Sequence, residues 1–346
     1  MNTRGAALKQ ATDSVYLSDL SPKDKTWDKR RGKSDGIQKL YLGTRYHEYS
    51  QKISNCSQLL DFSFEFDDTG VARLRLQAAW LCRCRHCAVC QGRRSLKWAA
   101  KTFKIMPKAL EEYPKARFVM LTLTIRNCPL DELRHTLSHM HESWRKLLKR
   151  KEWKVLGWIR ATEVTRSKTD DTAHPHYHCL LMVKPSYFTG ENYISQQRWR
   201  EMWGECLKVS YEPWIDVRAV KERKDFPKDL KDDPVMSAVV ETVKYAVKPE
   251  DILRGNNCHK PGERVRMTDQ EWLVELTSQL YKTRAIATGG ILKEYLKVLE
   301  DERQNEKDSL IYINEDGEYE PNDDSPRIRF SWDGGIKRYS VSDNFS

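Results

Sequence analysis

The feature of this sequence that most constrains its fold is a cluster of cysteines in a basic segment. The run LCRCRHCAVCQGRR contains Cys82, Cys84, Cys87 and Cys90. Cysteines at such short spacings are typical of a metal site, whereas disulfide frameworks belong to secreted chains. Because the first residues lack the apolar core of a signal peptide, we expect a cytoplasmic protein with a metal ion bound in this segment.

The segment that contains these cysteines is also strongly basic. From Cys82 to Lys108 the chain has eight Lys or Arg residues and no acidic residue. The net charge of the 346 residues is +10, and residues 301–346 hold 12 acidic and 6 basic side chains, so residues 1–300 carry +16. A dense basic run with aromatic side chains indicates a polyanionic partner such as nucleic acid. No apolar run approaches the roughly 20 residues of a membrane span, which argues against a membrane protein.

Composition and periodicity divide the chain into five regions. Residues 1–50 predict a basic polar arm, and residues 51–110 a β-hairpin at 59–78 followed by a cysteine-rich module that binds zinc and DNA. Residues 111–255 predict the core of the protein. Residues 256–300 predict a helical extension, and the acidic residues 301–346 a disordered tail.

The core region predicts an antiparallel sheet backed by helices. RFVMLTLTI is rich in β-branched residues, as in a buried strand, and apolar residues after Pro129 recur every three or four positions, as in a helix. The expected order is strand, helix, strand, strand, helix, strand, helix, at residues 117–125, 131–149, 152–165, 174–183, 195–209, 214–220 and 234–248. This order predicts a ferredoxin-like α+β fold.

Three histidines alternate along one predicted strand, in the run HPHYHCLLMV. Side chains two residues apart on a strand share a face, so His174, His176 and His178 can converge on one cation. Glu163 lies on the strand expected to pair with them, where opposite side chains are about 5 Å apart. Imidazole and carboxylate ligands together with a phosphate substrate favour Mg²⁺ or Mn²⁺.

A polar stripe follows one face of the helix predicted over 234–248. Glu241, Tyr245 and Lys248 are spaced i, i+4, i+7, and valines lie on the opposite face. A tyrosine in such a place is commonly a packing residue. It can, however, attack a phosphate when a cation favours its phenolate, and Lys248 is placed to help.

These segments together resemble a known family. RFVMLTLTI, the pair ATEVT and HPHYHCLL, and ETVKYAVKPED are similar, in order and spacing, to the three motifs of rolling-circle plasmid replication initiators. Those proteins are HUH endonucleases, and the resemblance is closest to the single-tyrosine group of small bacterial plasmids. It covers about residues 55–255, so the core at 111–255 is expected to be an HUH nuclease domain.

The resemblance implies a role for each matching residue. His176 and His178 are implied as the metal-binding pair, and Glu163 or His174 as the third ligand, of which we favour Glu163. Tyr245 matches the nucleophile that cuts one strand at the origin and stays on its 5′ phosphate. Glu241 matches the carboxylate that activates water when replication ends.

The cysteines also fit this family. The pattern C-x4-C-x2-C-x-x-R-R of the group is matched by Cys82, Cys87, Cys90, Arg93 and Arg94. Cys56 lies where the family often has another cysteine, so the resemblance implies a structural zinc ion held by Cys56, Cys82, Cys87 and Cys90. Cys84 departs from the pattern and, with His86 nearby, leaves the ligand set open. Basic side chains around the cysteines are expected to contact DNA: Arg83, Arg85, Arg93, Arg94 and Lys97.

The resemblance implies a replication initiator that nicks plasmid origin DNA, later rejoins or releases the strand, and works with a host helicase and polymerase. Two alternatives stay open. One is a transposase or relaxase that uses the same chemistry, although relaxases usually have their tyrosine near the N-terminus. The other is a zinc-dependent nucleic-acid-binding regulator without nuclease activity.

Overall fold

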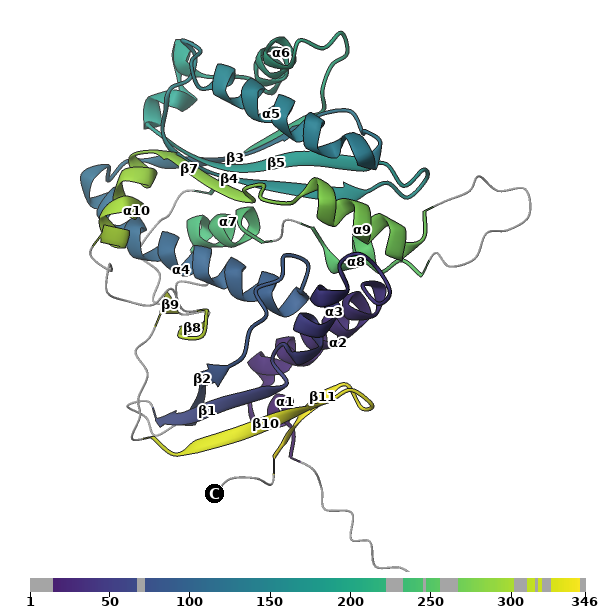
Figure 1. Cartoon of the computed structure of the whole chain (residues 1–346). Helices are drawn as coiled ribbons and strands as arrows, with labels where there is room; N and C mark the ends of the chain where they lie inside the picture. The colour runs from purple at the N-terminus through teal and green to yellow at the C-terminus, as the bar shows by residue number, and fades with distance from the viewer. Residues whose placement is uncertain are drawn as a thin grey trace, which may run out of the picture.

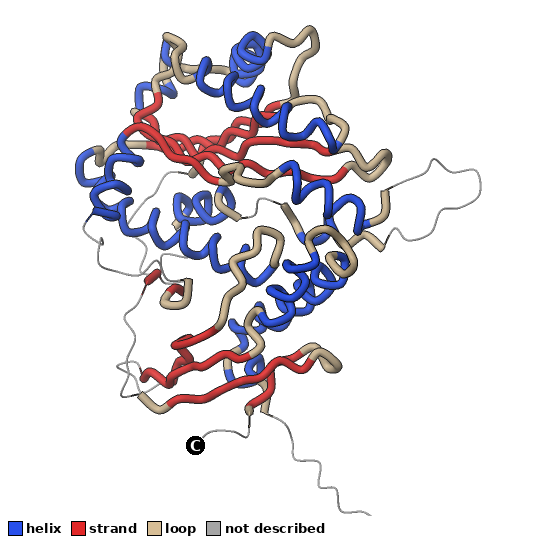
Figure 2. Tube along the Cα trace, in the orientation of Figure 1, coloured by secondary structure: helices blue, strands red, loops and turns tan. Residues whose placement is uncertain are grey.

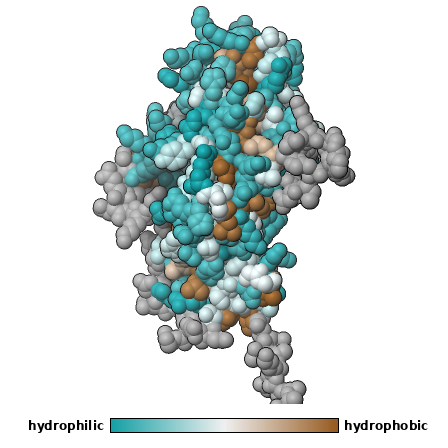
Figure 3. All heavy atoms as spheres, turned by 45° about the vertical axis from the view of Figure 1, so that its right-hand side comes forward, coloured by the Kyte–Doolittle hydropathy of each residue, from teal (hydrophilic) through white to brown (hydrophobic). Residues whose placement is uncertain are grey.

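The structure is a computed structural model that describes residues 15–66, 72–221, 233–244, 247–255, 267–301, 310–314, 317–318 and 325–342. Within these residues the strands form a five-stranded sheet, a four-stranded sheet and a short pair. Helices lie between the two larger sheets (Figures 1 and 2). None of the described helices is long and apolar enough to cross a membrane. On the face drawn in Figure 3, hydrophilic side chains cover most of the surface and apolar ones form separate patches.

The five-stranded sheet is antiparallel, with the order β6-β3-β5-β4-β7. Its strands are β3 (Arg117–Thr124), β4 (Val155–Arg166), β5 (Ala173–Val183), β6 (Ile215–Ala219) and β7 (Ile286–Gly290). Helices α5 (Leu133–Leu147) and α6 (Gln196–Leu207) cover one face (Figure 1). The other face is covered by α4 (Ala88–Glu112), α7 (Pro234–Thr242) and α10 (Ile291–Asp301). Both faces are covered, so most side chains of the central strands are buried.

The order of elements predicted for the core is the observed order. It runs β3, α5, β4, β5, α6, β6, α7, and β4 and β5 form the predicted antiparallel hairpin. The predicted start of α7 is also confirmed, because the Asp233 side chain accepts a hydrogen bond from Val235 N and Pro234 opens the first turn.

The predicted end of that helix is wrong. We expected a helix over 234–248, but α7 ends at Thr242. Pro249 opens the next short helix, α8 (Pro249–Ile252), and Lys248 before it is extended. A proline disfavours helical backbone in the residue before it, so Pro249 explains why Lys248, the last residue of the predicted helix, is extended. The expected common face of Glu241 and Lys248 therefore does not exist.

The four-stranded sheet joins the two ends of the chain, in the order β11-β10-β1-β2. Its strands are β1 (Leu59–Phe66), β2 (Ala72–Ala79), β10 (Arg327–Asp333) and β11 (Arg338–Val341). β1 and β2 pair as the predicted hairpin, whose turn lies outside the described residues. The short pair is formed by β8 (Ile313–Asn314) and β9 (Gly317–Glu318).

The prediction of a disordered tail over 301–346 is wrong for the part that the structure describes. β10 pairs with β1, and the side chains of Phe330 and Tyr339 are fully buried. The Tyr339 hydroxyl donates a hydrogen bond to the carbonyl oxygen of Ser57 at 2.6 Å. The composition of this region is acidic overall and did not reveal its four short strands, because composition averages over elements of two to seven residues.

The prediction of a polar arm over 1–50 is also wrong for residues 15–50. They form α1 (Leu17–Leu20), α2 (Lys25–Leu40) and the start of α3 (His47–Asn55). α2 buries Trp27, Arg31, Ser34 and Ile37 on one face. Arg31 is buried there because it pairs with Asp35 at 2.6 Å and donates to the Ser54 carbonyl. A buried arginine and serine interrupt the apolar stripe that would have revealed the helix.

The predicted extension over 256–300 contains a strand as well as helices. Helix α9 (Asp269–Gln279) lies in the expected place, but residues 286–290 form β7, which pairs with β4. Gly290 has φ +59°, and a Cβ atom there would lie 2.2 Å from the Leu156 carbonyl oxygen. A glycine is therefore required where β7 turns into α10 beside β4.

The four-stranded sheet provides a direct test of the tail. Phe330→Ala should lower the free energy of unfolding by about 3–5 kcal/mol, because it removes a fully buried ring. Urea unfolding followed by circular dichroism measures this loss. The matched control Ile336→Ala, at a half-exposed position between the same strands, should change stability by less than about 0.5 kcal/mol. Equal stability of Phe330→Ala and the unmodified protein would contradict the burial of this strand.

Candidate functional site

Strands β4 and β5 bring one carboxylate and two imidazoles together on the face covered by α4 and α7. Their register pairs Glu163 with His176. Glu163 Oε2 lies 3.0 Å from His178 Nε2 and 3.6 Å from His176 Nε2. The three side chains each offer a ligand atom within 4.8 Å of the others, and we call them the His–Glu centre.

The residues between these histidines hold the strand in place. Tyr177 points to the opposite face, where its buried ring lies 6.1 Å from the ring of Trp144 and beneath the Arg160 guanidinium. A bulky ring anchored on one face fixes the two histidines on the other, since side chains alternate along a strand.

The second nitrogen of each imidazole has its own partner. His178 Nδ1 lies 3.2 Å from Thr122 Oγ1, and His176 Nδ1 lies 3.1 Å from the His174 carbonyl oxygen. These contacts leave both Nε2 atoms directed toward Glu163. Such outer hydrogen bonds orient metal-binding histidines in many proteins. Thr122 was missed by the sequence analysis, although its strand was predicted.

Glu163 is buried, yet it is held as a carboxylate. Burial by itself would raise the pKa of this carboxyl, but hydrogen bonds with His176, His178 and Lys248 outweigh burial and hold the pKa well below its usual range. Lys248 Nζ lies 2.8 Å from Glu163 Oε1, and this contact raises the pKa of the lysine. The Glu163 side chain is therefore a carboxylate at neutral pH.

The donors of the His–Glu centre fit a divalent cation. One carboxylate oxygen and two imidazole nitrogens converge from adjacent strands, and three protein ligands leave room for water or substrate. His174, the alternative third ligand, is not part of this group, and its ring centre lies 5.2 Å from that of His176. The structure thus brings together Glu163, which we favoured as third ligand, and both histidines of the predicted pair.

A second group lies where α3, β2 and α4 meet. Cys56, Cys82, Cys87 and Cys90 are brought together as the sequence predicted, and we call them the four-cysteine centre. Their sulfur atoms are 3.6 Å apart for Cys82 and Cys90, 3.6 Å for Cys56 and Cys87, and 3.7 Å for Cys56 and Cys90. Zinc–thiolate bonds of about 2.3 Å in a tetrahedron place sulfurs about 3.8 Å apart, so the spacing fits a closed tetrahedral site.

Polar groups around the four-cysteine centre complete this fit. The backbone N–H groups of Arg83 and Cys84 donate to the sulfurs of Cys90 and Cys82, at 3.2 and 3.4 Å. Ser34 Oγ lies 3.4 Å from Cys87 Sγ. Donors aimed at sulfur stabilise thiolates, which is the form that binds a metal. Ser34 was missed, because the helix that carries it was not predicted.

The other cysteines do not join this centre. Cys84 is not part of this group, and its Sγ atom lies 3.7 Å from the Cys82 carbonyl oxygen. His86 is buried without a hydrogen-bond partner. Cys128, Cys179 and Cys206 are buried thiols and belong to neither candidate metal site. Cys258 lies outside the described residues.

The five basic residues predicted to contact DNA differ from one another in burial and in hydrogen-bond partners. Arg93 is buried, and its guanidinium donates to the carbonyls of Leu310, Ile311 and Ile313, so the prediction that it contacts DNA is wrong. A buried guanidinium that satisfies three carbonyls has a structural role. Arg85 donates to the carbonyls of Leu280 and Thr283, and Arg94 to those of Arg83 and Cys84. Arg83 is exposed and Lys97 is partly exposed.

The catalytic stripe expected on α7 is only partly described. Tyr245 lies outside the described residues. Glu241 is exposed near the end of α7, with Oε1 4.0 Å from Arg218 Nη2 on β6. Lys248 contacts Glu163, so it belongs to the surroundings of the His–Glu centre.

Comparisons with known proteins give a consistent result. A family model described as "Replication protein" (Rep_1) matches residues 73–340. The chain is 34% identical to a "Protein rep" of Streptococcus pneumoniae serotype 2, over 86% of each chain, and 34% identical to one of Bacillus amyloliquefaciens, over 88% of each. It is 30% identical to a "Replication protein" of Staphylococcus aureus, over 72% of this chain and 100% of that protein. No solved structure matches the chain.

The His–Glu centre predicts a specific pattern of metal binding. Glu163→Gln should weaken binding of Mn²⁺ about tenfold or more, because it removes the negative charge and one ligand atom. Calorimetric titration with Mn²⁺ measures the affinity. The control His174→Ala keeps the backbone carbonyl that holds His176 and should change the affinity by less than about threefold. An equal loss in both variants would make His174 a ligand.

Proposed function

The chain belongs to the Rep_1 family of replication proteins, and from that premise we propose that it initiates rolling-circle replication of a plasmid by nicking one strand at the origin. The observation that carries the proposal is the convergence of Glu163, His176 and His178 on one face of the sheet. Residues 111–255 would form the nuclease core, since the strand order β6-β3-β5-β4 agrees with a ferredoxin-like fold. A host helicase would then unwind the duplex, and a host polymerase would extend the nicked strand from its 3′ end.

We propose Tyr245 as the nucleophile, on the strength of the family motif. Lys248 follows it by three residues, at most about 11 Å of extended chain, and its ammonium group contacts Glu163. Lys248 therefore connects the segment that contains the tyrosine to the His–Glu centre. We had expected Lys248 to favour the phenolate directly. Its contact supports a positioning role, in which it orients the carboxylate.

The proposed reaction is an in-line displacement at one phosphodiester. The Tyr245 phenolate oxygen attacks phosphorus, the bond from phosphorus to the 3′ oxygen breaks, and that oxygen takes a proton. The 5′ phosphate stays on the tyrosine, and the free 3′ hydroxyl can prime synthesis. A Mg²⁺ or Mn²⁺ ion held by His176, His178 and Glu163 would offset the charge that develops on the phosphate oxygens.

We propose that Glu241 acts when replication ends, by taking a proton from the water that releases the strand. Its support is the family motif, together with a side chain that is open to solvent beside Arg218. The resemblance, and not a shared helix face with Tyr245, carries this assignment.

The four-cysteine centre has a separate proposed role, which is to hold a structural zinc ion. Four thiolates close the coordination shell and leave no site for a reactive water. The centre joins α3, β2 and the start of α4, so the ion would connect the four-stranded sheet to the helix beneath the nuclease sheet.

The nuclease proposal makes a clear prediction for Tyr245→Phe. This variant should form no covalent adduct with supercoiled origin DNA in the presence of Mn²⁺, because it lacks the attacking oxygen. Its binding to origin DNA should stay within about threefold of the unmodified protein, since binding depends on many basic contacts. A denaturing gel detects the adduct. If the unmodified protein shifts origin DNA but never nicks it, the protein is a regulator and not a nuclease.

The zinc proposal predicts one zinc ion per chain in reduced, untagged protein, measured by mass spectrometry of the metal. Cys87→Ser should lose that ion and melt at a lower temperature, because metal binding to such a site contributes to folding. Cys206→Ser, which changes a buried thiol in α6, should keep the full zinc content. Zinc-free protein that melts at the normal temperature would refute a structural ion.

A further inference from the structure

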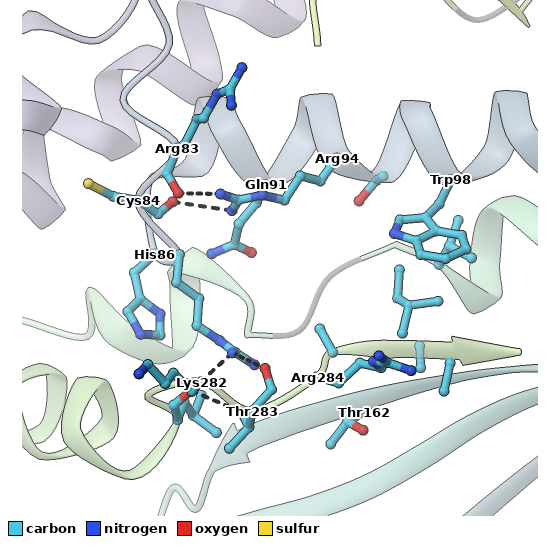
Figure 4. Close-up of a pocket in the computed structure, with 18 of the residues that line it drawn as sticks. Arg83, Cys84, His86, Gln91, Arg94, Trp98, Thr162, Lys282, Thr283 and Arg284 are labelled. Carbon is cyan, nitrogen blue, oxygen red and sulfur yellow. Dashed lines mark hydrogen bonds between the residues drawn. The ribbon is translucent and has the colours of Figure 1, made fainter. Parts of the chain in front are cut away.

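A cleft of about 900 Å³ lies between the start of α4 and residues 280–288 (Figure 4). One side is formed by residues 82–86 and the first turns of α4, including Arg94 and Trp98. The other side is formed by residues 280–288, and α10 contributes Lys293 and Lys297. Trp98 reaches toward the cleft from α4, and Thr162 and Arg284 lie across from it (Figure 4).

The charge of the cleft is strongly positive. Among the described residues that line it, eight are Lys or Arg and one is acidic. The acidic residue, Glu300, already pairs with Lys101 at 2.8 Å. The three basic side chains farthest along the chain, Arg284, Lys293 and Lys297, are exposed and belong to elements that the sequence analysis did not connect with DNA. A concave surface with so many positive charges and almost no negative ones attracts a polyanion.

Aromatic side chains accompany this charge. Tyr49, Trp98 and Tyr281 line the same cleft, and the Tyr281 side chain is 56% exposed. Lys282 lies 5.3 Å from the centre of the Tyr281 ring. Exposed aromatic rings beside basic groups are the combination by which proteins bind single strands, because each ring stacks on an unpaired base while each cation contacts the backbone. A duplex keeps its bases stacked inside and offers no such partner.

The cleft also leads to the proposed reaction centre. Ala161, which lines it, is two residues from Glu163 on β4 and pairs in register with His178. Val243, two residues before Tyr245 in the sequence, lines it as well. A strand lying in the cleft would therefore reach the His–Glu centre along the same face of the sheet.

We propose that this cleft binds single-stranded DNA and guides one strand to the His–Glu centre. Residues 82–98 form one wall of the cleft, and residues 280–288 with α10 form the other. Residues far apart in the sequence would therefore contact the same strand. The inference rests on the proposed function for the choice of DNA as the polyanion, whereas the cleft, its charge and its aromatic rings are features of the structure.

The test compares binding of a fluorescent oligothymidylate of about 20 nucleotides with binding of a duplex of the same length. The charge reversal Lys293→Glu/Lys297→Glu should weaken binding of the single strand about tenfold or more and bind the duplex within about threefold of the unmodified protein. Between about 50 and 200 mM salt, the slope of log affinity against log salt should fall by about 1.4, because two phosphate contacts are lost.

Two further variants complete the design. Tyr281→Ala should weaken binding of the single strand about fivefold without changing the salt slope, since stacking carries no counterion release. The matched control Lys146→Glu/Lys149→Glu makes the same charge change on and just after α5, on the other face of the sheet, and should bind the single strand within about threefold of the unmodified protein.

The proposal is overturned if the α10 variant binds the single strand as the unmodified protein does, or if the control loses as much affinity. The adduct experiment with Tyr245→Phe decides the nuclease proposal separately. If the unmodified protein forms the adduct and Lys293→Glu/Lys297→Glu binds the single strand normally, only the cleft proposal is refuted. If that variant loses single-strand binding but the unmodified protein forms no adduct, only the nuclease proposal is refuted.

Discussion

The register between β4 and β5 determines where every group of the candidate reaction centre lies. Glu163 stands opposite His176, and Ala161 opposite His178, so one hairpin supplies a carboxylate and two imidazoles to a single face. A slip of one residue would turn Glu163 toward α5 and move its charge into the aromatic layer around Tyr177. That layer resists such a slip, because Tyr177 and Arg160 are buried against Trp144.

The two faces of this sheet consequently have different tasks. The face toward α5 and α6 is a packed layer of tryptophans and tyrosines that fixes the strands. The face toward α4 and α7 has an apolar core at one end, around Met106, Leu180 and Val239, and the His–Glu centre at the other. Rigid packing on one side thus supports a polar site on the other, where a lysine from beyond α7 reaches the buried carboxylate.

The sequence was most informative where one short segment determines its own structure. The alternating histidines, the hairpin partner Glu163 and the four cysteines were predicted, because strand alternation and short ligand spacings are local signals. Helix α2 was missed because its buried stripe includes Arg31, whose partners Asp35 and Ser54 could not be recognised in advance. β7 and β10 were missed because each is short and pairs with a distant strand, and β11 because it has four residues and pairs only with β10. The role of Arg93 was assigned wrongly for the same reason, since the carbonyls that it contacts lie more than 200 residues later.

The four-stranded sheet has a consequence for how the molecule is made. The cysteine ligands and β1 are synthesised before the five-stranded sheet, whereas β10, β11 and the Tyr339 hydroxyl that holds Ser57 beside Cys56 are synthesised after it. Folding of a nascent chain proceeds from the N-terminus, and pairing between distant strands is slow. The four-stranded sheet beside Cys56 therefore closes only after the five-stranded sheet has been synthesised, and a chain that stops before β10 lacks half of its strands.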